Sequence, residues 1–188
     1  MAKVRGLGAR PRIREEAHLR SDPAVSPQPF CRYVAFRAAG AEDVPALVTL
    51  INEAYRVEAF FVSGPRTSAP EVEELRRSGV YLIAEEADGR PAGCVYVGRR
   101  GEHGYFGLLS VDPVLQGRGI GRRLAAAAEA RLWAEGHREV EILVVDLRKE
   151  LFAFYAGLGY REVGEEPFPA EVTPSLPCHF VVLRKPLG

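Results

Sequence analysis

The sequence predicts an α/β protein of one domain, in which helices pack on a mixed β-sheet. Three observations lead to this fold class: segments of strand-like alternation take turns with segments of helical periodicity, one pair of strands carries a hairpin signal, and the length suits one core. The chain has 188 residues, which is too few for two comfortable domains. Hairpin and crossover connections together imply both antiparallel and parallel pairing.

The first half of the domain is expected to contain four strands and two helices. Residues 33–37 alternate and predict a strand. Residues 41–58 predict a helix, with one apolar face made of Val44, Leu47, Val48, Ile51 and Tyr55. Residues 59–68 read as a loop that contains aromatic side chains and Arg66, and residues 70–78 as a short helix. Residues 80–86 and 91–100 flank the turn Asp88-Gly89 and predict a hairpin, and residues 105–111 a further strand.

The second half begins with the glycine-rich stretch QGRGIG and a helix that runs to about Glu135, where Gly136 is a natural stop. Residues 138–145 predict a strand. Residues 149–160 predict a short helix with Leu151, Phe154, Tyr155 and Leu158 on one face and Gly159 at its end. Residues 161–166 and 179–185 predict the last two strands, joined by a proline-rich connection.

Charge and cysteine content argue against several functional classes. The net charge is zero, but residues 1–32 carry seven Lys/Arg against three Asp/Glu, and residues 33–188 carry 18 against 22. A slightly acidic body does not suit a nucleic-acid-binding protein, and the apolar runs fall short of the roughly 18 residues of a membrane helix. Cys31, Cys94 and Cys178 are odd in number and far apart, so we expect neither a disulfide framework nor a metal site; a reducing cytoplasm suits them.

Residues 1–32 are predicted to be a flexible extension that precedes the domain. The stretch is rich in Arg and Pro, has no clear period and lacks the apolar region of a secretory signal. A basic docking arm is the alternative. The domain itself is therefore expected over residues 33–188.

The stretch QGRGIG, residues 116–121, places three glycines at a predicted helix start. Free N–H groups and the positive end of the helix dipole bind phosphate there, and glycine lets an anion approach the backbone. A P-loop is excluded, because Arg122 and Arg123 follow where Lys and Ser/Thr are required. A dinucleotide fingerprint fits poorly, because the spacing is GxGxG instead of GxGxxG. A tight turn without a ligand is the remaining alternative, although one glycine would suffice for it.

The longer segment LLSVDPVLQGRGIGRRL, residues 108–124, resembles the central motif of the GNAT superfamily, the acyl-CoA-dependent N-acyltransferases. The matching positions are Leu109, Val111, Asp112, Pro113, Gln116, Gly119 and Gly121. FYAGLGY, residues 154–160, is similar to the family's FYxxxGF. The resemblance covers about residues 33–188, and it implies a central mixed, mostly antiparallel sheet with a splayed parallel pair and helices on both faces.

The resemblance also implies that acetyl-CoA binds along this segment as a cosubstrate. Backbone N–H groups from Gly117 to about Arg122 would hold the pyrophosphate, and Arg118, Arg122 and Arg123 would add positive charge. Residues 109–111 would pair with the pantetheine amides, and one N–H there would polarise the thioester carbonyl. The cofactor-binding residues implied in this way, with no metal among the ligands, are Leu109, Ser110, Val111, Gln116, Gly117, Arg118, Gly119, Ile120, Gly121 and Arg122.

Acyl transfer to an amine requires a neutral amine, a stabilised oxyanion and a proton for the departing thiolate. Tyr155 matches the family tyrosine whose hydroxyl lies near the CoA sulfur, so the resemblance makes it the candidate acid. A tyrosine with an ordinary pKa of about 10 stays protonated at neutral pH and is able to donate. The alternative is that Tyr155 only packs. Phe152, Phe154 and Tyr160 are interpreted as core residues.

The base and the acceptor site are less sharply predicted. Strand 105–111 contains no carboxylate where many relatives carry a Glu, which leaves a water chain or a more distant group: Glu85, Glu141, Asp146 or, less favoured, His103 and His179. Many relatives also carry Asn after the next strand, where this chain has Asp146 and Arg148. The acceptor is expected near the first helix, the 59–68 loop and the last connection, beside Tyr55, Glu58, Phe60, Phe61 and Arg66. Arg66 either holds a substrate carboxylate or, slightly preferred, is an ordinary loop residue.

These patterns predict a cytoplasmic, acetyl-CoA-dependent N-acetyltransferase that acts by direct transfer in a ternary complex. Its acceptor is expected to be a primary amine of a small molecule or a peptide. No cysteine matches a catalytic position, so we do not predict an acyl-enzyme. A non-catalytic acyl-CoA-binding or regulatory domain is the alternative. Neither nucleic acid nor membrane is expected as a partner, and the resemblance is compatible with a homodimer.

Overall fold

The computed structural model describes residues 36–169 and 172–188, which belong to one compact unit running from Cys31 to Gly188. The predicted extension over residues 1–32 lies outside the described residues and stays a prediction, as does the start of the first expected strand. In the part of the chain that is described, no helix combines the length and the apolar character needed to cross a membrane.

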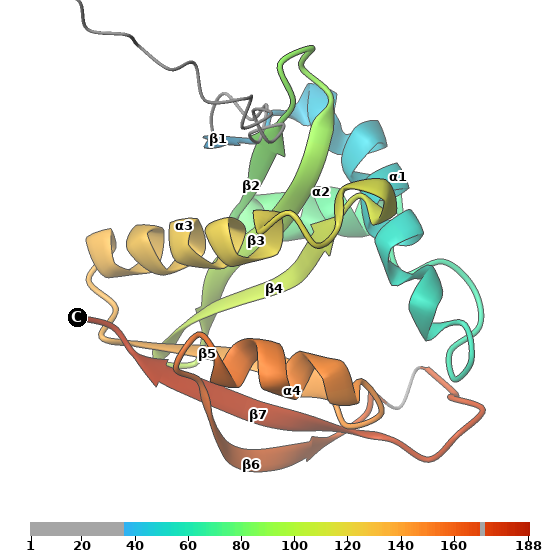
Figure 1. The fold of residues 1–188 in the computed structure, drawn as a ribbon, viewed down its shortest axis with the longest axis vertical. Helices are drawn as coiled ribbons and strands as arrows, with labels where there is room; N and C mark the ends of the chain where they lie inside the picture. Colours follow the sequence, from blue (N-terminus) through green and yellow to red (C-terminus); the bar gives the residue numbers. More distant parts are fainter. Residues whose placement is uncertain (1–35, 170–171) are drawn as a thin grey trace, which may run out of the picture. The chain divides into compact units, whose positions relative to one another are not determined.

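Seven strands form one sheet in the order β1-β2-β3-β4-β5-β7-β6 (Figure 1). They are β1 (Phe36–Ala38), β2 (Val80–Glu85), β3 (Pro91–Arg100), β4 (His103–Val111), β5 (Glu139–Val145), β6 (Arg161–Pro167) and β7 (His179–Pro186). Every neighbouring pair is antiparallel except β4 and β5, which run parallel. The predicted mixed, mostly antiparallel sheet is confirmed.

Helices cover both faces of this sheet, as predicted. The α-helices are α1 (Val44–Ala54), α2 (Ala69–Ser78), α3 (Ile120–Ala134) and α4 (Lys149–Ala156). Three short 3-10 segments accompany them: η1 (Ala41–Asp43), η2 (Tyr55–Glu58) and η3 (Pro113–Leu115). α1 and α2 pack on one face of the sheet, and α3 and α4 pack on the other.

Alternation along β2 assigns its side chains to the two faces. Tyr81 and Ile83 pack in the cluster with α1 and α2, whereas Leu82 and Ala84 pack in the cluster with α3 and α4. All four are buried, so residues 81–84 of β2 have no solvent-facing side. This part of the sheet is a middle layer between two sets of helices, and the site described below lies where the strands part.

Two helix boundaries differ from the prediction. The expected helix over residues 41–58 is a central α-helix flanked by η1 and η2. The expected helix over residues 149–160 ends at Ala156, and the chain then turns until Gly159, which has a left-handed φ of 93°. Gly159 thus ends the turn that returns the chain to β6, and not the helix itself.

Candidate active site

β4 and β5 pair only near their beginnings, where Gly104 lies opposite Val140 and Tyr105 opposite Glu141. Beyond these residues the two parallel strands diverge, and a cavity of about 730 Å³ lies between them. Residues 142–145 of β5 form one wall, and Phe106 to Leu109 together with Val111 of β4 form the other. This is the splay that the resemblance implies, and it opens a gap in an otherwise continuous sheet.

β4 carries a bulge where it borders the cavity. Cys94 of β3 pairs with Ser110 and Tyr96 pairs with Gly107, which leaves Leu108 and Leu109 opposite a single β3 residue. Leu108 has a φ of 50° and is the one non-glycine residue with positive φ in the described part of the chain. The Ser110 hydroxyl donates to the Leu108 carbonyl at 3.0 Å. A bulge changes the direction in which backbone groups point, so the backbone of β4 changes direction where the strand forms the cavity wall.

The glycine-rich stretch forms one end of the cavity. Gly117 and Gly119 have φ values of 76° and 78°, so the turn itself favours glycine at both positions. A Cβ at either position would meet no other atom within 4 Å. Gly119 precedes α3 as its N-cap, and no side chain caps the first amides of that helix. An open concavity beside the N-terminus of a long helix fits an anionic group such as a pyrophosphate.

Most of the predicted cofactor-binding residues meet in this cavity. The predicted cofactor-binding residues that line it are Leu109, Val111, Gln116, Gly117, Gly119, Ile120, Gly121 and Arg122. Ser110 is buried inside the sheet, and neither it nor Arg118 belongs to the cavity lining. Arg123 lies over the Phe36 ring, with its guanidinium carbon 5.2 Å from the ring centre, and does not line the cavity either.

Tyr155 contributes to the cavity wall from α4 and is 7% exposed. Its ring packs against Phe154 and Tyr160, with ring centres 5.0 and 5.6 Å apart. Burial raises the pKa of the Tyr155 hydroxyl, which therefore holds its proton well above neutral pH. The side chain is therefore packed against its neighbours and borders the cavity with its hydroxyl protonated.

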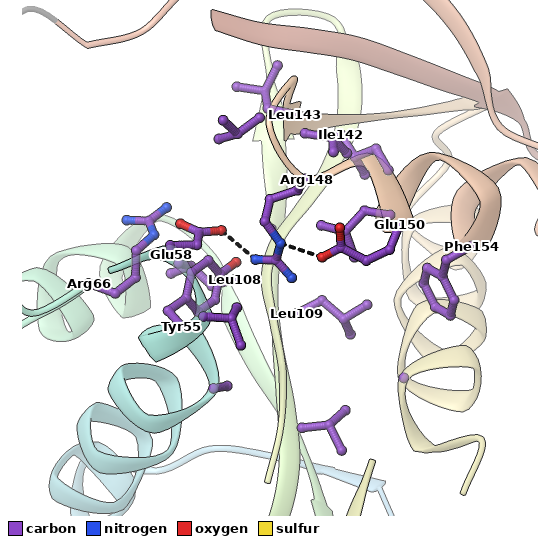
Figure 2. A pocket seen from close by; sticks show the side chains of 18 of the residues that line it. Tyr55, Glu58, Arg66, Leu108, Leu109, Ile142, Leu143, Arg148, Glu150 and Phe154 are labelled. Atoms are coloured by element: carbon purple, nitrogen blue, oxygen red, sulfur yellow. Dashed lines mark hydrogen bonds and ion pairs between the residues drawn. The ribbon is translucent and has the colours of Figure 1, made fainter. Parts of the chain in front are cut away.

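An ion-pair bridge crosses the cavity from the α1 side to the α4 side (Figure 2). Arg148 donates from Nη1 to Glu58 Oε1 at 2.7 Å and from Nε to Glu150 Oε1 at 2.6 Å. The side chains of Arg148 and Glu58 are only 15% and 13% exposed, whereas that of Glu150 is 64% exposed. Burial raises the pKa of Glu58, and the attraction of Arg148 and Arg66 offsets this only in part.

The acceptor residues expected from the sequence divide into two groups. Tyr55, Glu58 and Arg66 line the cavity, and Figure 2 shows them together on one side of it. The Arg66 guanidinium carbon lies 5.0 Å from the centre of the Tyr55 ring, and burial raises the pKa of Tyr55 to about 12. Phe60 and Phe61 do not line the cavity; Phe61 is fully buried, and Phe60 lies on the outside.

Two loops meet at this side of the cavity. The Ser175 amide donates to the Phe61 carbonyl at 2.8 Å, and the Ser175 hydroxyl donates to the Phe60 carbonyl at 3.2 Å. The connection between β6 and β7 also supplies Phe168, Pro169 and Val172 to the cavity lining. This side of the cavity is therefore formed by segments far apart in the sequence, and its use as an acceptor site stays a prediction.

None of the base candidates proposed from the sequence lines the cavity. Glu85 pairs with Arg37, and Glu141 with Arg100 and Arg184. Asp146 accepts from the His179 amide, and His103 lies against Glu139. These groups form ion pairs and hydrogen bonds within the sheet and at its edges. Among the described residues, the carboxylates that line the cavity are Glu58 and Glu150.

Sequence reasoning missed the chemical role open to Glu58 and the placement of Phe154. Phe154 was expected in the core, yet it lines the cavity between Glu150 and the start of α3. Arg148 was noted only as a departure from the family's Asn. The available signal was helical spacing: Glu150, Leu151, Phe154 and Tyr155 recur on one helical face, and all of them line the cavity.

The chain matches the family described as "Acetyltransferase (GNAT) domain" over residues 51–173, which is more than half of its length. Among curated proteins it is similar to a mycothiol acetyltransferase from Clavibacter michiganensis subsp. michiganensis, with 33% identity over 103 residues that cover 47% of this chain and 33% of that protein. A mycothiol acetyltransferase from Clavibacter sepedonicus is 35% identical over 81 residues, covering 43% of this chain and 27% of that protein. The chain thus spans about a third of the length of these relatives or less.

Solved structures share the fold at low sequence identity. A GNAT superfamily phosphinothricin acetyltransferase from Sinorhizobium meliloti, in complex with AcCoA, matches with a TM-score of 0.67 and 20% identity over 84% of this chain and 89% of its own. The ribosomal-protein-S18-alanine N-acetyltransferase from Escherichia coli matches with a TM-score of 0.64 and 16% identity over 82% and 94%. At these identities the likeness shows the arrangement of elements and not the substrate.

Proposed function

The chain belongs to the GNAT acetyltransferase family, and we propose that it is an acetyl-CoA-dependent N-acetyltransferase that transfers the acetyl group directly to a primary amine. The observation that carries this proposal is the cavity between the splayed strands β4 and β5. It brings the glycine-rich stretch, the bulged edge of β4 and Tyr155 to one space. The acceptor is a small molecule or a peptide, bound at the end that Tyr55, Glu58 and Arg66 line.

The residues of the cavity divide the work of acetyl transfer. Backbone amides from Gly117 to Arg122 hold the pyrophosphate at the start of α3, where the helix dipole favours negative charge. Backbone groups of β4 near its bulge bind the pantetheine arm, and one amide there stabilises the oxyanion as the amine attacks the thioester carbon. When the carbon–sulfur bond breaks, Tyr155 donates its proton to the thiolate.

A non-catalytic acyl-CoA-binding domain is the competing proposal, because β4 offers no carboxylate in the residues between Tyr105 and Val111. A thermal-shift titration with acetyl-CoA, CoA and NAD addresses the cofactor first. A ligand that binds only the folded state raises the melting temperature with concentration. We expect a rise with acetyl-CoA and CoA and none with NAD.

Release of free thiol in the presence of phenylethylamine, L-alanine and an Ala-Ala-Ala peptide then addresses turnover. Release that depends on one of these amines supports the enzyme. A rise in melting temperature without release on any amine supports the binding domain instead. No rise with either CoA species would overturn the assignment of the glycine-rich stretch.

A further inference from the structure

The cavity offers few groups that are able to take a proton from an acceptor amine. Within the described residues, the carboxylates that line it are Glu58 and Glu150, and no histidine or cysteine joins them. A primary amine is mostly protonated at neutral pH, and its lone pair attacks only after that proton has left. Among the described residues, these two carboxylates are therefore the candidate proton acceptors at the cavity.

Glu58 and Glu150 share Arg148 as a partner but differ in their surroundings. Glu150 is 64% exposed at the first turn of α4; burial alone would raise its pKa, but the bond and charge of Arg148 together with a backbone hydrogen bond lower it. Glu58 is 13% exposed, and burial raises its pKa. A carboxylate whose pKa is raised toward neutral pH is the stronger base of the two.

The backbone around Glu58 holds the side chain in place. Glu58 ends η2, and its carbonyl accepts from the amides of Phe61 and Val62 at 3.0 Å each. Its carboxylate is directed to Arg148, on the far side of the gap between the strands (Figure 2). The bond uses Oε1, and in the described part of the chain no hydrogen bond reaches Glu58 Oε2, which is therefore open to an ammonium group.

We propose that Glu58 is the catalytic base that receives the proton of the acceptor ammonium, and that Arg148 positions it; the inference rests on the proposed acetyl transfer. Glu58 takes one proton from R-NH₃⁺, and the free amine attacks the thioester carbon. The carbon–sulfur bond breaks, and Tyr155 gives its proton to the departing sulfur. The nitrogen then loses its second proton, which returns to the Tyr155 oxygen. The proton on Glu58 then leaves to solvent, so the sum is amide, free thiol and one proton.

The charged and titratable groups that act on Glu58 come from several elements. They are Arg148 and Glu150 at the start of α4, Arg66 in the loop after η2, and Cys178 before β7, whose own pKa responds to Glu58; Tyr55 lies on η2 itself. The two arginines favour the ionised form of Glu58 and lower its pKa, whereas burial and the charge of Glu150 favour the neutral form and raise it. The wild-type kcat/KM is therefore expected to fall as the pH drops toward the raised pKa of Glu58.

Glu58→Gln tests the proposal, with Glu150→Gln as its matched control. Glutamine keeps an acceptor for Arg148 in both variants and removes basicity. With acetyl-CoA and the amine of the panel that turns over fastest, we expect Glu58→Gln to lower kcat by about 100-fold or more and Glu150→Gln by about threefold or less. The Kd for acetyl-CoA, measured calorimetrically, is expected to change less than about threefold in either variant.

An acyl hydrazide, which is neutral at neutral pH, separates a base from a packing residue. With it as acceptor, we expect the defect of Glu58→Gln to shrink to about threefold. An equal defect with both acceptors, or equal defects in both variants, would overturn the assignment of Glu58. A wild-type kcat/KM that stays constant down to about pH 5 would also overturn the assignment of Glu58. This measurement uses only the wild type, so it does not depend on whether a variant folds.

The wild type distinguishes this inference from the function on which it rests. A wild-type chain that binds acetyl-CoA and acetylates none of the amines overturns the proposed function, and the role of Glu58 with it. If Glu58→Gln acetylates an amine as fast as the wild type does, the proposed function stands and only the role of Glu58 as the base is overturned.

Discussion

The paired end of strands β4 and β5 holds a buried carboxylate, Glu141, and the splayed end borders a half-buried one, Glu58, and the two carboxylates have opposite pKa shifts. At the paired end Glu141 is 3% exposed and accepts from Arg100 and Arg184 at 2.7 and 2.8 Å. Burial alone would raise the pKa of Glu141, but these two bonds outweigh it and lower the pKa. At the splayed end Glu58 has one such bond, and burial prevails.

Two arginines donate hydrogen bonds to Glu141 and one donates to Glu58, and this difference accompanies the opposite directions of their pKa shifts. Two arginines hold Glu141 ionised, and Arg100 reaches on to Glu166 at the sheet edge, so this end is a network that ties strands together. Glu58 has a second oxygen and a cavity in front of it.

Gly119→Glu should remove acetyl-CoA binding at the splayed end. A carboxylate there would meet the pyrophosphate, and like charges about 4 Å apart repel by about 4 kcal/mol in partly screened surroundings, or about 1,000-fold in Kd. Calorimetric titration measures this. Gly89→Glu is the control, because Gly89 also has positive φ, 83°, and open space around it but lies in the β2–β3 turn. Equal losses of affinity in the two variants would contradict the site.

Tyr155→Phe should lower kcat by about 100-fold and leave the Kd for acetyl-CoA nearly unchanged, since it removes only the hydroxyl. Tyr160→Phe is the control, because its hydroxyl donates to Glu129 at 2.9 Å outside the cavity. That variant should lower the melting temperature by a few degrees with little effect on kcat. A Tyr155→Phe enzyme with wild-type kcat would leave Tyr155 a packing residue only.

Glu141→Gln, at the paired end, should lower the free energy of unfolding and leave kcat nearly unchanged. It weakens two charged bonds, and because Arg100 and Arg184 are 38% and 34% exposed, solvent screening limits the loss to about 1–2 kcal/mol. Urea unfolding at pH 7 measures this. Glu135→Gln, which breaks an exposed pair with Arg131, should cost less than about 0.5 kcal/mol.

The Glu141 effect should also depend on pH. Its folded-state pKa lies below the unfolded value of about 4.3, so its contribution is present above that pH and is lost as the pH falls through the folded-state pKa. The gap in unfolding free energy between wild type and Glu141→Gln should therefore narrow on acidification. A gap that stays constant down to pH 3 would contradict the lowered pKa of Glu141.

Local patterns predicted the elements well because each pattern reports neighbours in the chain. The hairpin at Asp88-Gly89, the alternation of residues 80–86 and the helix after QGRGIG all formed near their expected positions. The helix that was expected to reach Gly159 ended earlier, because a glycine with positive φ marks the last turn residue as readily as a helix end. Phe154 packs against the core, as expected, and also lines the cavity, because apolar periodicity does not distinguish a core from a cavity wall.

By itself, the sequence determined the fold class, the GNAT resemblance, the glycine-rich stretch and the position of Tyr155 on its helix, since periodicity and motif spacing are properties of residues close together. Only the tertiary structure decided which carboxylate meets the cavity. Glu58 and Arg148 are 90 positions apart, and their side chains meet at the cavity that lies where the strands part after Tyr105 and Glu141. Burial and charge act through space, so the pKa shifts of Glu58 and Glu141 follow from packing that no local pattern records.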